Sequence, residues 1–116
     1  MRNDRDNIIV NKTIEFSIAI IKYCGLLEQH RRFVISKQLL RSATSIGANV
    51  FEAKNAESKA DFIHKMKIAA KEADETDYWL TLCELSNNYP TNDQLNEKLQ
   101  SVINIISKII SSSKSH

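Results

Sequence analysis

The chain has 116 residues, which is enough for one domain and too few for two domains of ordinary size. Apolar residues make up 42% and charged residues 26%, a globular composition, and no apolar run approaches the ~20 residues of a membrane span. A net charge of +2 is too balanced to predict nucleic-acid binding from charge alone.

Turn-forming residues are scarce, with two Gly and one Pro in the chain, so long helices are expected and a β-rich fold is not. The polar start of the chain is unlike a signal peptide. Cys24 and Cys83 lie far apart within apolar helical patterns. Buried free thiols in a cytoplasmic, reducing compartment fit this arrangement.

The first helix is expected over residues 8–27, after a frayed start at residues 1–7. Two neighbouring apolar stripes make this helix apolar over much of its circumference. One stripe is Ile9, Ile14, Ile18 and Ile21, and the other is Phe16, Ile20, Tyr23 and Leu27. A helix that buries more than one face usually packs against more than its own bundle, so self-association is predicted.

The second helix is expected over residues 37–55, with Ser36 as its N-cap. One side carries small and apolar residues, which lets a neighbouring helix approach closely: Leu39, Ala43, Ile46, Val50 and Ala53. A polar stripe runs on nearly the opposite side, with residues about one turn apart: Arg41, Ser45, Asn49 and Glu52. This polar stripe is interpreted as a specifier of helix register or of a subunit contact.

The third helix is expected over residues 59–85, starting at a capping-box variant formed by Ser58 and Asp61. Pro90 breaks the pattern, and a second capping box of Thr91 and Gln94 starts a fourth helix over residues 92–111, before a disordered tail. Both helices show heptad-like seams. The seam of the third helix is Phe62, Met66, Ala69, Ala73, Thr76, Leu80 and Cys83, and that of the fourth is Leu95, Leu99, Val102, Ile106 and Ile109. The pattern predicts an all-α fold, an antiparallel up-down-up-down four-helix bundle that forms one domain over residues 1–116.

Catalytic motifs are absent from the sequence. There is no His-x-x-x-His or Glu-x-x-His spacing, and Gly25 and Gly47 stand alone, so no enzyme, metal site or cofactor is predicted. The acids of the third helix are expected to be solvated or paired with Arg41. Tyr78 and Trp79 lie outside the apolar seam and are interpreted as part of a subunit interface.

Several basic residues are candidates for a phosphate-binding surface. They are Arg31, Arg32, Lys37, Arg41, Lys54, Lys59, Lys65, Lys67 and Lys71. Acids are interleaved with them, so a solvated helix face is the alternative interpretation of the same pattern.

The run from Arg41 to Glu52 resembles a signature of the bacterial four-helix bundle proteins encoded in intervening sequences of 23S ribosomal RNA genes, many of which carry ribosomal-protein labels. The matching residues are Gln38, Arg41, Ala43, Ser45, Ile46, Asn49, Glu52, Ser58, Asp61, Phe62, Ile68 and Ala69. Val50 and Ala53 stand where the family has Ile and Gly.

This resemblance implies a non-catalytic protein that assembles as a ring-like homo-pentamer. Similar proteins include the accessory variability determinant of diversity-generating retroelements, a basic pentamer that binds a reverse transcriptase and nucleic acid. Two functions are therefore open for this chain: binding of RNA or DNA, or a scaffold for a protein partner such as a reverse transcriptase.

Overall fold

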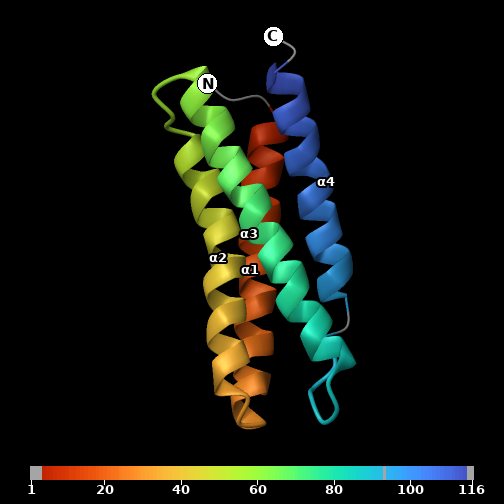
Figure 1. Ribbon diagram of the computed structural model, residues 1–116. Helices are drawn as coiled ribbons and strands as arrows, with labels where there is room; N and C mark the ends of the chain where they lie inside the picture. The colour runs from red at the N-terminus through yellow and green to blue at the C-terminus, as the bar shows by residue number, and fades with distance from the viewer. Residues whose placement is uncertain (1–3, 93, 115–116) are drawn as a thin grey trace.

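Four helices follow one another in the computed structural model, which describes residues 4–92 and 94–114 (Figure 1). They are α1 (Asp4–Gln29), α2 (Phe33–Ala53), α3 (Lys59–Leu85) and α4 (Leu95–Lys114). Contacts run from α1 to α2, from α2 to α3, from α3 to α4, and from α4 back to α1. This arrangement confirms the antiparallel four-helix bundle, which measures 48 × 19 × 19 Å.

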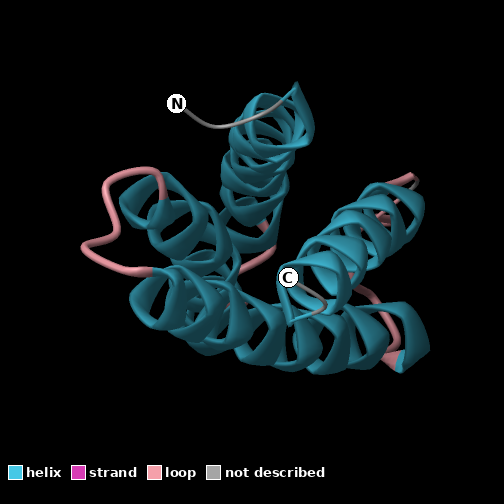
Figure 2. Cartoon of the chain, turned by 90° about the horizontal axis from the view of Figure 1, so that it is seen from above, coloured by secondary structure: helices cyan, strands magenta, loops and turns pink. Residues whose placement is uncertain are grey.

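The three connections between the helices are divided between the two ends of the bundle. The α1–α2 turn and the α3–α4 loop lie at one end, and the α2–α3 connection lies at the other end (Figure 1). Viewed from above, the helices are arranged around a common centre and are joined by short loops (Figure 2).

The first helix is longer than expected at both ends. It begins at Asp4, so the prediction of a frayed start is wrong for residues 4–7, and residues 1–3 lie outside the described part. The helix also passes through Gly25 and ends at Gln29.

The prediction that Ser36 caps the second helix is wrong. Arg31 has a φ of 61° and reverses the chain within a very short turn, so α2 begins at Phe33, directly after Arg32. Ser36 is buried one turn into α2, where its hydroxyl lies 3.3 Å from the carbonyl oxygen of Cys24. The residue fastens α2 to α1 and does not start a helix.

The start of α3 agrees with the prediction. The Ser58 hydroxyl accepts a hydrogen bond of 3.0 Å from the backbone N–H of Asp61. The Asp61 carboxylate accepts at 3.1 Å from the N–H of Glu57, one residue earlier than in the usual capping box. The preceding helix ends at Ala53, two residues before the expected end.

The start of α4 differs from the prediction. The helix begins at Leu95 and not at residue 92, because Gln94 takes a left-handed φ of 69° that no helix can include. The capping box of Thr91 and Gln94 is therefore wrong. Asn92 is buried instead, and its amide donates to the carbonyl oxygen of Leu80 at 3.3 Å, which ties the loop to α3.

The far end of α4 also departs from expectation. Residues 111–114 are helical, where a disordered tail was predicted, and residues 115–116 lie outside the described part.

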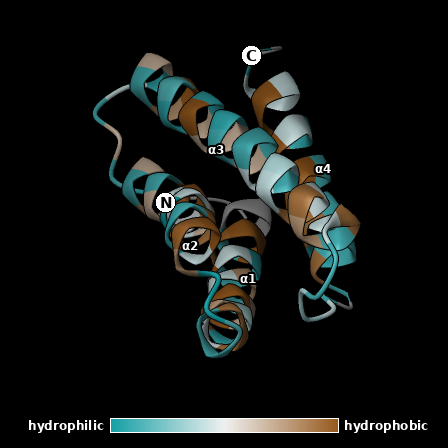
Figure 3. Ribbon diagram, turned by 60° about the horizontal axis from the view of Figure 1, so that its bottom comes forward, coloured by the Kyte–Doolittle hydropathy of each residue, from teal (hydrophilic) through white to brown (hydrophobic). Residues whose placement is uncertain are grey.

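The predicted seams form the core. All five small and apolar residues of the α2 stripe are buried, and so are the seam residues of α4: Leu95, Leu99, Val102, Ile106 and Ile109. On α3 the seam is buried except for Phe62, which is partly buried against the core. Apolar and polar residues alternate around each helix (Figure 3). Cys24 and Cys83 are free and buried, as predicted.

Candidate assembly surface

The two apolar stripes of α1 have different surroundings. Phe16, Ile20 and Leu27 are at most 1% exposed, whereas Ile14, Ile18 and Ile21 are 46%, 56% and 54% exposed. Ile9, predicted to share one stripe with Ile14, Ile18 and Ile21, is buried in the core. We call Ile14, Ile18 and Ile21 the isoleucine ridge. Contiguous exposed apolar residues of this kind mark interaction sites.

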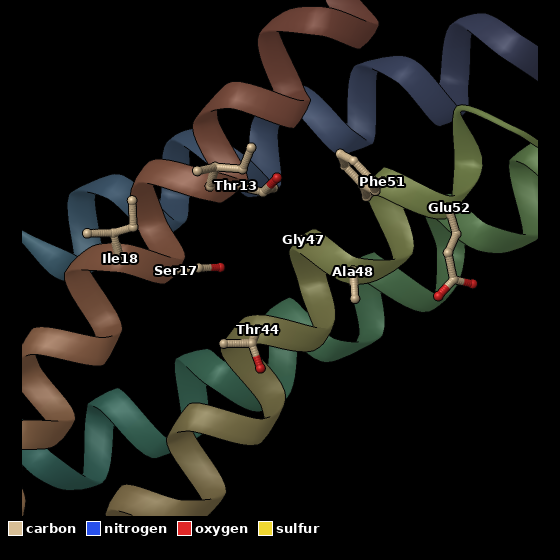
Figure 4. A pocket seen from close by; sticks show the side chains of 9 residues that line it. Thr13, Ser17, Ile18, Thr44, Gly47, Ala48, Phe51 and Glu52 are labelled. Carbon is tan, nitrogen blue, oxygen red and sulfur yellow. The ribbon is translucent and has the colours of Figure 1, made fainter.

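A groove of about 460 Å³ lies beside the ridge, between α1 and α2. Gly47 forms part of its wall. A Cβ at that position would lie 3.4 Å from the Thr13 Cβ, so α2 approaches α1 closely there. Ile18 and Thr13 face this groove from α1, and Phe51 lies at its other side on α2 (Figure 4). Phe51 is 52% exposed, so the groove and the ridge form one apolar surface.

Sequence reasoning missed Phe51 and Gly47 as parts of this surface. Phe51 belongs to neither stripe of α2, and an aromatic residue outside both stripes was the available signal. Gly47 stands alone in the sequence, and its position opposite Thr13 follows from the packing of α2 on α1.

The predicted polar stripe of α2 lies along α3. Arg41 forms an ion pair with Glu75, and its Nη1 lies 3.6 Å from Oε1 of Glu72. At the other end of the stripe, Glu52 accepts from Lys65 at 3.0 Å. The prediction that acids of α3 pair with Arg41 is confirmed for Glu72 and Glu75.

The two middle residues of the stripe bond within their own helix. The Ser45 hydroxyl donates to the carbonyl oxygen of Arg41 at 2.7 Å, and the Asn49 amide donates to that of Ser45 at 2.8 Å. Arg41 and Glu52, at the two ends of the polar stripe, therefore join α2 to α3 within one chain. The role of the polar stripe in a subunit contact stays a prediction.

Tyr78 and Trp79 differ in exposure. The indole N–H of Trp79 donates to Glu75 at 2.9 Å, and the ring packs partly buried against the core. Tyr78 is 57% exposed, and its ring lies edge-on to Trp79 with centroids 5.1 Å apart. Tyr78 is therefore an exposed aromatic residue held against a fixed neighbour.

The predicted basic residues are not gathered on one surface. Arg31, Arg32 and Lys37 lie near the α1–α2 turn, whereas Lys54 and Lys59 lie at the opposite end of the bundle (Figure 1). Lys65 and Lys71 lie on α3 between them. The structure therefore separates the predicted set into groups along the long axis.

Several of these cations already have neighbours within the chain. The Arg32 guanidinium lies 4.8 Å from the Tyr89 ring centroid, and the Lys54 ammonium lies 3.9 Å from that of Phe51. The Glu52 carboxylate raises the pKa of Lys65 by hydrogen bonding and by charge.

Lys67 has a different neighbour, because Lys114 lies beside it on α4. The pKa of Lys67 is lowered by Lys114, first through a contact between their side-chain ammonium groups and second through repulsion of like charges.

Residues 4–92 and 94–114 contain neither a cluster of metal-ligating side chains nor a helix suited to crossing a membrane. No three His, Cys, Asp or Glu side chains in this part converge on a point where a metal ion would bind. None of the described helices combines the length and the apolar character needed to cross a membrane.

A protein family and a solved structure match this chain over most of its length. A model of the family described as 23S rRNA-intervening sequence protein matches residues 5–112. A crystal structure of a protein of unknown function from the S23 ribosomal protein family of Bacteroides thetaiotaomicron VPI-5482 is similar, with 41% identity and a TM-score of 0.86. The alignment covers 92% of this chain and 98% of that one. No curated protein matches the chain.

Proposed function

This chain belongs to the 23S rRNA-intervening sequence protein family, and we propose that it is a non-catalytic protein that works as a homo-oligomer, a pentamer. One observation carries the proposal: the isoleucine ridge and Phe51 expose a continuous apolar surface on a bundle whose core is already complete. Burying apolar surface is favourable by about 25 cal/mol per Å². Contact with another copy would remove this apolar surface from water and would therefore stabilise the oligomer.

Sedimentation velocity on three proteins tests the proposal. The unmodified chain is expected to sediment as an oligomer, and Ile18→Glu is expected to sediment as a monomer, because a charge would be buried in the interface. Val34→Glu is the matched control, since Val34 is 80% exposed and lies away from the groove. Unchanged sedimentation of Ile18→Glu, with its helix content intact, would contradict assembly through this surface.

A different protein on the same surface is the competing proposal, with a reverse transcriptase as one class of partner. The two proposals differ for the isolated chain. Self-assembly predicts an oligomer without any addition, whereas a scaffold for another protein predicts a monomer until that protein is added.

Binding of RNA or DNA is a second candidate function, and the exposed cations of α3, which are Lys59, Lys67 and Lys71, favour it. The experiment is titration of labelled structured RNA at rising salt. Affinity that falls steeply with salt, and less steeply in Lys67→Gln, would support binding. Absent binding at low salt would contradict it.

A further inference from the structure

An exposed aromatic ring follows two arginines in the turn between α1 and α2, at one end of the bundle (Figure 1). Phe33 is 59% exposed, and Arg31 and Arg32 directly precede it. It is the first residue of α2, and helical side chains lean toward the N-terminus of their helix. The Phe33 ring therefore leans toward the end of the bundle, away from the groove that the proposed assembly uses.

The two exposed phenylalanines of α2 differ in what covers their rings. The Lys54 ammonium lies 3.9 Å from the ring centroid of Phe51, so one face of that ring is occupied. Among residues 4–92 and 94–114, neither a cation nor an aromatic ring lies against Phe33. The Phe33 ring is therefore available for stacking with a group from outside the chain.

Three cations flank this ring. The Arg32 guanidinium is held over Tyr89, 4.8 Å from the ring centroid. Arg31 is exposed in the turn, and Lys37 lies one helical turn after Phe33 on the same side of α2. No carboxylate in the described part of the chain forms an ion pair with any of these three cations.

Two acids also lie at this end of the bundle. The Glu28 carboxylate accepts a hydrogen bond of 3.2 Å from the Ser36 hydroxyl, and Glu84 is exposed in the last turn of α3. Three cations therefore share this end with two carboxylates, and the local charge is positive by a small margin. A small excess suits contact with few phosphates and not the long charged track of a duplex.

We propose that this end of the bundle binds single-stranded RNA or DNA, with one base stacked on Phe33 and the adjacent phosphates held by Arg31 and Lys37. A single strand leaves its bases unpaired, and every base offers a flat face to an aromatic ring. Arg32, fixed on Tyr89, supplies a stationary positive charge beside the stack. This inference rests on the candidate function of nucleic-acid binding, and it names the class of nucleic acid and a surface separate from the cations of α3.

The size of this end favours a strand over a protein partner. The bundle measures 19 Å in both of its short directions. Its whole end is therefore smaller than the roughly 800 Å² that each partner contributes to a stable protein interface. One stacked nucleotide and its neighbouring phosphates fit on such an area.

Fluorescence anisotropy with a labelled, unstructured RNA of about ten nucleotides tests the proposal. Phe33→Ala is expected to weaken binding by about fivefold or more, because the stacking face is lost. Phe33→Trp keeps a stacking face and should keep the affinity. Val34→Ala is the matched control, since Val34 is an adjacent apolar residue, 80% exposed, that cannot stack.

The charges are tested with the same RNA. Arg31→Gln should weaken binding and make it less dependent on salt, because one phosphate contact is lost. A DNA strand of the same sequence should bind as well, since stacking does not use the 2′-hydroxyl. A duplex of that sequence should bind the unmodified chain and Phe33→Ala equally. Circular dichroism of each variant is the control for folding.

The remaining outcomes separate this inference from the candidate function. Equal weakening by Phe33→Ala and Val34→Ala would show a general apolar contact, as with a protein or a lipid surface, and would overturn the stacking site. Unstructured strands that do not bind at low salt, while structured RNA does, overturn the inference and leave nucleic-acid binding in place. Failure of every nucleic acid to bind at low salt overturns both.

Discussion

The hydroxyl of Thr76 on α3 meets the hydroxyl of Ser42 on α2 at 2.9 Å, and both residues are buried in the core. The Ser42 hydroxyl in turn donates to the carbonyl oxygen of Leu39 at 3.3 Å. These contacts place a small polar link inside an otherwise apolar seam, and the link sets the register of α2 against α3.

Removing one hydroxyl of this link should destabilise the fold modestly. Ser42→Ala is expected to lower the free energy of unfolding by about 1 kcal/mol. The loss stays small because the Thr76 hydroxyl also lies 2.8 Å from the carbonyl oxygen of Glu72. Urea denaturation of Ser42→Ala, Thr76→Val and the double variant measures the coupling. Strictly additive losses in this cycle would show that the two hydroxyls do not interact.

The two glycines should respond differently to alanine. Gly25→Ala is expected to raise the free energy of unfolding by about 0.8 to 1 kcal/mol, because alanine favours a helix and its Cβ meets no atom. Gly47→Ala should gain less, since its Cβ would lie 3.4 Å from that of Thr13. Both changes are measured by urea denaturation in the Ile18→Glu background, so that assembly does not contribute. An equal gain at both positions would contradict the close approach at Gly47.

Stability should fall in alkaline solution because of Tyr23. Burial, followed by the neighbouring Cys83, raises the pKa of Tyr23 above its ordinary value of 10.0. A pKa raised in the folded state means that the unfolded chain loses its proton first. The stabilising contribution is therefore complete below about pH 10 and is lost as pH rises further. The measurement is the free energy of unfolding against pH.

Tyr23→Phe is the matched variant for this alkaline loss. It removes the hydrogen bond of 2.8 Å from the Tyr23 hydroxyl to the carbonyl oxygen of Pro90, so it should be less stable at neutral pH. Its stability should then fall less steeply above about pH 10. The thiols contribute from lower pH, because burial raises the pKa of Cys24 and Cys83 above 9.0. Equal slopes for both proteins would exclude Tyr23 as the cause.

The ion pairs of Arg41 should contribute little to stability. Arg41 is 48% exposed at its side chain, and exposed pairs are worth about 0 to 1 kcal/mol. Arg41→Met is therefore expected to change the free energy of unfolding by less than about 1 kcal/mol in chemical denaturation. A larger loss would mean that Arg41 also orders Glu75 beneath Trp79.

The core was predictable because periodicity reports burial directly. Leu39, Ile46 and Val50 follow the helical repeat, and all three lie in the core. The helix boundaries were harder, because they depend on backbone conformations at Arg31 and Gln94 that side-chain patterns do not encode. Both residues take left-handed φ values, which are uncommon outside glycine.

The candidate surface was only partly predictable, because part of it depends on how α1 and α2 pack together. The double apolar stripe of α1 indicated an unpartnered side, and Ile14, Ile18 and Ile21 are indeed exposed. The groove depends on the approach of α1 to α2 at Gly47, which is a tertiary feature. The positive charges appeared as one set in the sequence, but antiparallel helices place Arg31 and Lys59 at opposite ends.

The mass of the unmodified chain in solution tests self-assembly most directly. Light scattering on a size-exclusion column, with absorbance recorded for nucleic acid, gives this mass without any substitution. A homo-pentamer has a mass near five chains of 13.2 kDa, and this mass should persist on dilution to low micromolar concentration. A mass of 13.2 kDa at every concentration would contradict it and would assign the apolar surface of α1 and α2 to a different protein.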